Sequence, residues 1–221
     1  MSRQNFFLNI GGFVGSFSMD SSGSGGVSDS GNTKTESRAS GSFRSLKSQI
    51  SGKVTVRHGD AAGITVEADE NIVPLITSEI INNELTIAAK GSYSTSRPIK
   101  ISVIVPEGQP LPDLILLGSG DISMHDIDQS LLAVTLSGSG DINLSGRVAR
   151  VDLTLQGSGD IDARRLKSEE VVVSLMGSGD IEAYATDKAT VKLVGSGDVV
   201  ISGSPKNVSS SSVGSGDVSI R

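Results

Sequence analysis

The motif Gly-Ser-Gly-Asp constrains this chain more than any other feature, because it occurs six times at a nearly constant spacing. Successive copies are separated by 20, 19, 20, 18 and 19 residues, and each is followed by Ile or Val. The copies begin at Gly118, Gly138, Gly157, Gly177, Gly195 and Gly214. A motif that recurs at a period of about 19 residues predicts a solenoid, in which each repeat forms one coil and stacks on the next.

The residues on either side of each motif alternate between apolar and polar. Before the third copy, Val151, Leu153 and Leu155 are separated by polar residues, and after the second copy Ile142 and Leu144 continue the alternation. A period of two indicates strands with one buried face. The apolar phase stays fixed relative to the motif, and no Asn-Gly or Asp-Gly dipeptide lies between the strands. These observations favour stacked parallel strands over hairpins.

We therefore predict an all-β protein whose body is a parallel β-helix with coils of about 19 residues. Residues 118–221 hold the regular repeats. Residues 43–117 are β-rich but lack the motif, so they form either less regular coils or a separate cap. We assign residues 43–221 to one β-solenoid domain, because no linker-like segment interrupts them.

The glycines and aspartates of the motif are predicted to be structural. A corner this tight needs the positive φ that Gly adopts easily, and stacked corners leave no room for a Cβ. Six carboxylates stacked one per coil would repel each other if bare. We therefore expect them to accept hydrogen bonds from Ser hydroxyls and corner N–H groups. The predicted corner ladder consists of Asp121, Asp141, Asp160, Asp180, Asp198 and Asp217.

The same ladder is the only candidate for cation binding or catalysis. Carboxylate oxygens suit Ca²⁺, and the motif is similar to the Gly-rich calcium β-roll repeat, although that repeat has a nine-residue period. Equivalent carboxylates give no pair with separated pKa values, and His58 and His125 are isolated. The chain has no Cys, which excludes disulfides and Cys-based metal sites. We predict no enzymatic activity, metal or cofactor, with Ca²⁺ binding by the ladder as the alternative.

The N-terminal residues differ from the rest of the chain. Residues 1–20 contain four of its five Phe and are predicted to be a tail that docks on a partner. Residues 21–42 are rich in Ser and Gly, which predicts a flexible linker. The interrupted apolar run with one basic residue makes a poor signal peptide, and no segment is apolar enough to span a membrane. The partner-docking candidates are Phe6, Phe7, Phe13 and Phe17.

Charge and aromatic content narrow the range of partners. The net charge is −6 and no stripe of Lys and Arg is present, which argues against nucleic acid. Sugar sites usually use exposed aromatic side chains, and Tyr93 and Tyr184 are the only tyrosines in a chain without Trp. Carbohydrate binding therefore has no support from the sequence. A protein partner or a second copy of the chain is the expected contact.

The Gly-Ser-Gly-Asp-Ile repeats, the Val-x-Leu-x-Leu runs and the lead-in Ile99-Lys-Ile-Ser-Val-Ile-Val-Pro106 resemble one bacterial family. This is the family called "putative auto-transporter adhesin, head GIN domain", or DUF2807. The resemblance covers residues 43–221 and implies a right-handed parallel β-helix. It also implies an extracellular or cell-surface location. The poor signal peptide leaves a cytoplasmic location as the alternative.

Together these features predict a non-enzymatic structural or adhesive β-solenoid, tethered through its N-terminal tail to a surface or a multi-chain assembly. One alternative is a scaffold that polymerises end to end through an unfinished last coil. A second alternative is a calcium-dependent surface protein.

Overall fold

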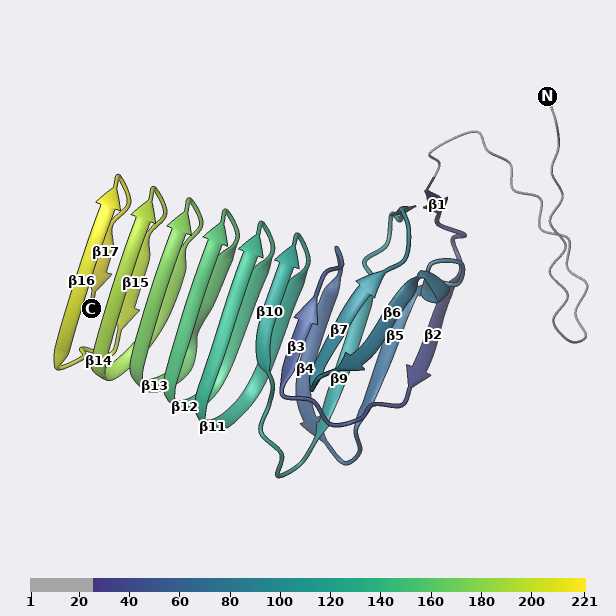
Figure 1. Cartoon of the computed structure of the whole chain (residues 1–221), viewed down its shortest axis with the longest axis horizontal. Helices are drawn as coiled ribbons and strands as arrows, with labels where there is room; N and C mark the ends of the chain where they lie inside the picture. Colours follow the sequence, from purple (N-terminus) through teal and green to yellow (C-terminus); the bar gives the residue numbers. More distant parts are fainter. Residues whose placement is uncertain (1–25) are drawn as a thin grey trace, which may run out of the picture.

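The computed structural model describes residues 26–221, most of which lie in β-strands (Figure 1). The elements are β1 (Val27–Ser28), β2 (Thr33–Arg38), β3 (Ser45–Ser48), β4 (Lys53–Gly59), β5 (Gly63–Asp69), the 3₁₀ turn η1 (Val73–Leu75), β6 (Ile76–Ile81), β7 (Glu84–Ala89), β8 (Tyr93–Ser94), β9 (Lys100–Pro106), β10 (Asp113–Gly118), β11 (Asp121–Gly138), β12 (Asp141–Gly157), β13 (Asp160–Gly177), β14 (Ile181–Gly195), β15 (Val199–Ser202), β16 (Asn207–Gly214) and β17 (Val218–Ile220). Within this range no helix is long and apolar enough to cross a membrane.

Strands β10 to β17 form a stack of coils, as the repeats predict. Each coil rises to a tight corner at the top of Figure 1, and its strands pair in parallel with those of the next coil. The register keeps equivalent residues of the repeats beside each other, as with Gly138 and Gly157. The predicted parallel β-solenoid is therefore confirmed.

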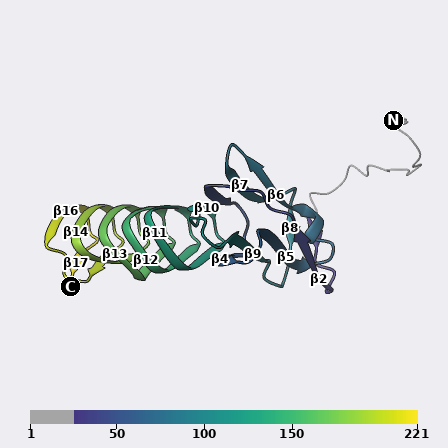
Figure 2. The same ribbon diagram turned by 90° about the horizontal axis from the view of Figure 1, so that it is seen from below.

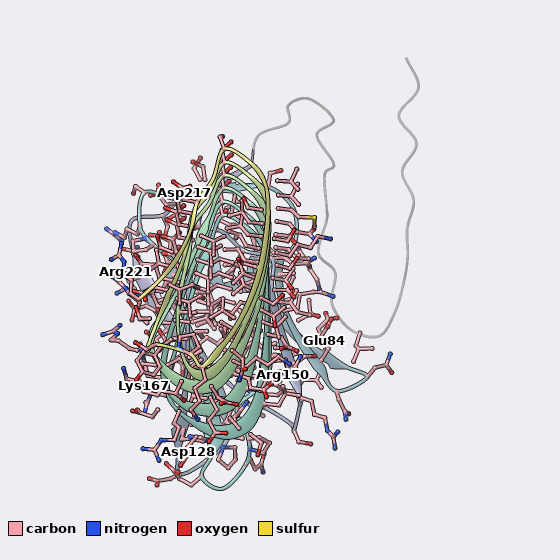
Figure 3. The ribbon with its side chains drawn as sticks, turned by 90° about the vertical axis from the view of Figure 1, so that its left-hand side faces the viewer. Glu84, Asp128, Arg150, Lys167, Asp217 and Arg221 are labelled. Atoms are coloured by element: carbon pink, nitrogen blue, oxygen red, sulfur yellow. The ribbon has the colours of Figure 1, made fainter. Side chains whose placement is uncertain are left out.

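The core is built from columns of aliphatic side chains that run along the stack. Equivalent positions of successive coils are paired neighbours, so each core side chain packs against the equivalent side chain of the next coil. Figure 3, a view along the stack, shows side chains filling the interior of the flattened coil. Full burial of a leucine contributes about 2 kcal/mol through the hydrophobic effect. One such column, fully buried throughout, contains Leu116, Leu136, Leu155, Leu175 and Leu193.

Residues 43–117, which the sequence leaves open between coils and a cap, form two further parallel levels followed by antiparallel strands. Strands β3 and β4 pair in parallel with β10 and β11, and β7 and β9 pair in parallel with β3 and β4. The chain makes the β3–β4 level first, then the β7–β9 level beyond it. From β9 it then returns past the β3–β4 level to begin β10.

Antiparallel strands end the stack on the N-terminal side. Strand β6 pairs with β7 across a hairpin in which Asn82 and Asn83 both have positive φ, as a two-residue hairpin turn requires. Strand β5 pairs antiparallel with β9, and β2 pairs antiparallel with β5. Figure 2 shows the β6–β7 hairpin standing out from the line of the rod.

Strand β2 lies inside the segment 21–42 that the sequence predicts to be a flexible linker, and here that prediction is wrong. The strand reads Thr-Lys-Thr-Glu-Ser-Arg and is mostly exposed, so its composition resembles that of a linker. The Arg38 guanidinium holds it in place by donating hydrogen bonds to the carbonyl oxygens of Ile76 (2.8 Å) and Val73 (3.2 Å). The folded body therefore begins before residue 43.

In strand β16 of the last coil two of the apolar columns of β14 end in serine, whereas Val208 continues a third opposite Ala189. Ser210 pairs with Val191 and Ser212 pairs with Leu193, so serine occupies positions that are aliphatic in earlier coils. Both serines are exposed. Strand β17 keeps Val218 and Ile220 in line with Val199 and Ile201 of β15. Serine therefore replaces aliphatic side chains at two inward positions of this coil, a protective feature that sequence reasoning missed.

The serine positions lead to a test of end-to-end association. We expect the double substitution Ser210→Val and Ser212→Leu to extend the apolar columns into solvent and to promote self-association. Sedimentation velocity over a concentration series measures the effect. Ser209→Val and Ser211→Leu, at the adjacent outward positions, form the matched control. Equal association of the two double variants would contradict a capping role for Ser210 and Ser212.

Candidate functional site

The six aspartates of the motif lie in one exposed column beside the tight corners. The backbone N–H of each later Asp donates to Oδ1 of the Asp one coil earlier, with N···O distances from 2.8 to 3.4 Å. Asp180 illustrates the pattern, because its N–H donates to Asp160 and its Oδ1 accepts from Asp198, both at 2.8 Å. Each such carboxylate thus joins two coils.

The corner serines make a second column, separate from the carboxylates. The hydroxyls of Ser196 and Ser215 lie 3.0 Å apart. Within residues 26–221, no corner serine hydroxyl bonds to a carboxylate of the ladder, and the N–H groups of the aspartates themselves supply the bonds.

The two glycines of each motif are required for different reasons. The first, such as Gly177, has a positive φ of 146°, and a Cβ there would lie 2.0 Å from the carbonyl oxygen of Gly157. The second, such as Gly179, lies outside the left-handed region, but a Cβ would lie 1.8 Å from the carbonyl oxygen of Gly159. Stacking alone therefore excludes any larger residue at the second glycine.

A seventh corner escaped sequence reasoning. The segment Ile50-Ser51-Gly52-Lys53 connects β3 to β4, and Lys53 pairs with Asp121 at the ladder position. The hydroxyls of Ser51 and Ser119 lie 3.0 Å apart, so the serine column continues into this coil. The signal was present as Ser-Gly followed by a charged residue and Val. Lys in place of Asp and the missing first Gly concealed it.

The aspartate ladder is amenable to a direct test. We expect Asp160→Ala to lower the free energy of unfolding by about 1 kcal/mol, because the N–H of Asp180 loses its acceptor. Asp160→Asn keeps an Oδ1 acceptor and removes one of the stacked charges, so it should match or exceed the original stability at low salt. Urea unfolding at low and high NaCl concentrations measures both. Equal losses for the two variants would show that the carboxylate charge, rather than the acceptor, matters.

Charge pairs link neighbouring coils on the outer faces of the rod. Arg150 lies 2.9 Å from Asp152 and 3.9 Å from Glu170 one coil further along. Arg164 pairs with Asp162 at 2.8 Å, and its hydrogen bonds hold the pKa of that carboxyl below its usual range. A lowered pKa means that Asp162 stabilises the fold above about pH 4 and that this contribution disappears on acidification. These half-exposed pairs support the stack and do not form a reactive centre.

The two histidines take up separate structural positions. Nε2 of His58 lies 2.9 Å from the carbonyl oxygen of Gln109, and Nδ1 of His125 lies 2.9 Å from Oγ of Ser145. Neither is hydrogen-bonded to a carboxylate in the described part of the chain. Across residues 26–221 no group of three or more His, Cys, Asp or Glu side chains is placed to hold a metal ion. The predicted docking residues Phe6, Phe7, Phe13 and Phe17 lie outside the described residues.

Solved structures share this architecture. The chain aligns with a "putative adhesin" from Bacteroides fragilis NCTC 9343 at 23% identity and a TM-score of 0.72, covering 89% of this chain and 100% of the other. A "putative lipid binding protein" from Parabacteroides distasonis ATCC 8503 gives 23% identity and 0.59, with 88% and 99% covered. A "putative adhesin" from the same species gives 20% and 0.57, with 89% and 100% covered. At these identities the likeness establishes the fold alone.

No curated protein matches the sequence. A family model does match it, over residues 42–112 and 111–205, and so covers both the irregular N-terminal levels and most of the regular coils. The motif, the parallel register and this match agree. The chain belongs to the DUF2807 family, described as "Putative auto-transporter adhesin, head GIN domain".

Proposed function

We propose that this protein is a non-enzymatic adhesive β-solenoid that acts at the cell surface or in a multi-chain assembly, attached through its N-terminal segment. The strongest support comes from the structural role of the repeated aspartates. The carboxylates of the column accept hydrogen bonds from backbone N–H groups of neighbouring coils, which is a structural role. The family, named for adhesins, supports the same role and an extracellular location.

The outer surface of the rod suits a contact role. Parallel sheets place Thr135, Thr154 and Ser174 at equivalent outward positions of successive coils. This column of hydroxyl groups offers a repeated pattern of hydrogen-bonding groups to a partner. A specific hydrolytic activity that disappears on mutation of a single ladder aspartate would contradict the proposal.

Two alternatives receive less support. End-to-end polymerisation is disfavoured by the exposed Ser210 and Ser212, which stand at positions that are aliphatic in earlier coils. Calcium dependence predicts a melting temperature that rises with Ca²⁺ but not with Mg²⁺, and an unchanged melting temperature would remove it.

Attachment through the N-terminal segment predicts tail-dependent association. We expect the full chain to associate in sedimentation velocity as its concentration rises, and a variant without residues 1–25 to remain monomeric, because the apolar Phe side chains are removed. This deletion leaves every described strand intact. A full-length variant with Phe6, Phe7, Phe13 and Phe17 replaced by Ser provides the matched control. Association that persists in both variants would contradict the proposal for the tail.

A further inference from the structure

An open groove of about 750 Å³ lies beside the seventh corner, between that corner and the segment that follows β7. Its volume falls within the range of small-molecule sites in proteins. The fold creates it by bringing together residues that are about 40 positions apart in the sequence. The polar and aromatic residues that line it are Gln49, Ser51, Ser92, Tyr93, Ser94 and Thr95.

The lining contains no charged side chain. Anionic ligands are usually bound by Arg or Lys, and cations by carboxylates, so neither class is favoured here. Serine and threonine hydroxyls and the Gln49 amide can each donate and accept hydrogen bonds. Such a lining matches a neutral ligand that carries many hydroxyl groups.

Tyr93 adds an aromatic surface to these polar groups. Its ring is partly buried, packs against the hydrophobic core and lines the groove. Strand pairing fixes its backbone, because Tyr93 pairs with Val27 and the Val27 N–H donates to the carbonyl oxygen of Ser92 at 3.0 Å. An aromatic ring held in this way supplies apolar contact area at a low cost in conformational entropy.

Small residues keep the groove open. Ala88, Ala89 and Gly91 line it, and a Cβ added at Gly91 would meet nothing within 4 Å. At one end, the Thr95 hydroxyl donates to the carbonyl oxygen of Arg97 at 2.9 Å. At the other, Ser51 belongs to the serine column of the corners. The hydroxyls at both ends of the groove are thus held by hydrogen bonds within the fold.

We propose that this groove binds a neutral carbohydrate. Tyr93 provides the platform on which the C–H face of a sugar ring packs, and Gln49, Ser51 and Ser92 provide hydrogen bonds to its hydroxyls. The inference rests on the adhesive function proposed above and names a ligand class for it. It also goes beyond the sequence, which gives carbohydrate binding no support.

The chain has two tyrosines and no Trp, which allows a direct measurement. In a full-length Tyr184→Phe variant, Tyr93 is the only source of tyrosine fluorescence. The probes are linear oligosaccharides of glucose, galactose, mannose and N-acetylglucosamine, with oligogalacturonate as the charged comparison. We expect at least one neutral oligosaccharide to change the emission saturably, and oligogalacturonate to leave it unchanged. Absence of a saturable change with every neutral probe would overturn the proposal.

Variants of the groove test the assignment by calorimetry with the oligosaccharide that binds. Tyr93→Ala should weaken binding at least tenfold, Tyr93→Phe should keep it within about threefold, and Tyr184→Ala should not alter it. Because Tyr93 also packs on the core, the exposed Gln49→Ala is the second variant, with an expected loss of about fivefold. Equal affinities for Tyr93→Ala, Gln49→Ala and Tyr184→Ala would place the sugar elsewhere and refute the proposal.

The outcome is separable from that of the adhesive role. Sugar binding is measured on the isolated chain in solution, whereas attachment through the tail is measured by sedimentation of the tail variants. Retained sugar binding in a chain that never associates would contradict tail-dependent self-association and leave the groove assignment standing. Tail-dependent association without sugar binding would contradict the groove assignment and leave the proposal for the tail standing.

Discussion

Replacing Gly179 with alanine is expected to lower the free energy of unfolding by about 3–4 kcal/mol. The added Cβ would lie 1.8 Å from the carbonyl oxygen of Gly159, and both groups belong to the backbone. The hydrogen bonds of adjacent corners hold that separation, as with the N–H of Ser178 and the carbonyl oxygen of Gly157 at 2.9 Å. The clash can be relieved only by parting two coils. Urea unfolding followed by far-UV circular dichroism measures the loss.

Gly108→Ala is the matched control for this prediction. Gly108 has a φ of +81°, but a Cβ there would meet nothing within 4 Å. It therefore has the conformational penalty of a left-handed residue without the clash, and we expect a loss of about 1 kcal/mol. Gly179 has the clash without the left-handed backbone. A loss at Gly179 no larger than that at Gly108 would mean that the coils separate easily at their corners.

The second large effect is expected in the core. Leu155→Ala should lower the free energy of unfolding by about 3 kcal/mol, because it opens a cavity between two neighbouring coils. Leu155 is fully buried and stacks between Leu136 and Leu175 in adjacent coils. A solenoid has no third layer that could move in to fill the space. Chemical denaturation of the full chain gives the value.

Thr154→Ala, at the adjacent outward position, provides the comparison for Leu155. Thr154 is half-buried and faces away from the columns, so we expect its loss to stay below about 0.5 kcal/mol. Similar losses for the two variants would show that the interior of the coil relaxes around the cavity.

The regular coils could be predicted from the sequence because each depends only on its neighbours. The motif fixes the corner, the alternation fixes the buried face, and identical repeats fix the register. None of these inferences needs knowledge of distant residues. The same locality explains why Leu153, Leu155 and Ile142 could be assigned to the core from their positions relative to the glycines, and all three are buried.

The N-terminal levels could not be predicted in this way because their pairings are long-range. In space β3 lies between β7 and β10, whereas in the sequence β7 lies between β3 and β10. Nothing in the alternation of Lys53–Gly59 specifies that insertion. Strand β2 was missed for a different reason, since an exposed edge strand and a polar linker have similar compositions.

The two candidate sites differ in the same way, because one depends on neighbouring repeats and the other on long-range pairing. The aspartate column follows from the repeat, and of the two kinds of donor expected for it the corner N–H groups supply the bonds and the serine hydroxyls do not. The groove at Tyr93 depends on the approach of Gln49 and Ser51, which is a consequence of the long-range levels. A lone tyrosine in the sequence contains no sign of that neighbourhood.

The hydrogen bonds to the side chains of the aspartate column all run one way, from the N–H of a later coil to the carboxylate of an earlier one. A finished coil thus offers an acceptor that is already in place, and the coil that follows supplies the donor. From residue 118 onward the order of coils along the chain is also their order in space. A polypeptide that emerges amino end first from a ribosome or a secretion channel can therefore lay each turn on a completed template. The rod has a built-in direction of growth, and its assembly does not have to wait for the carboxyl end.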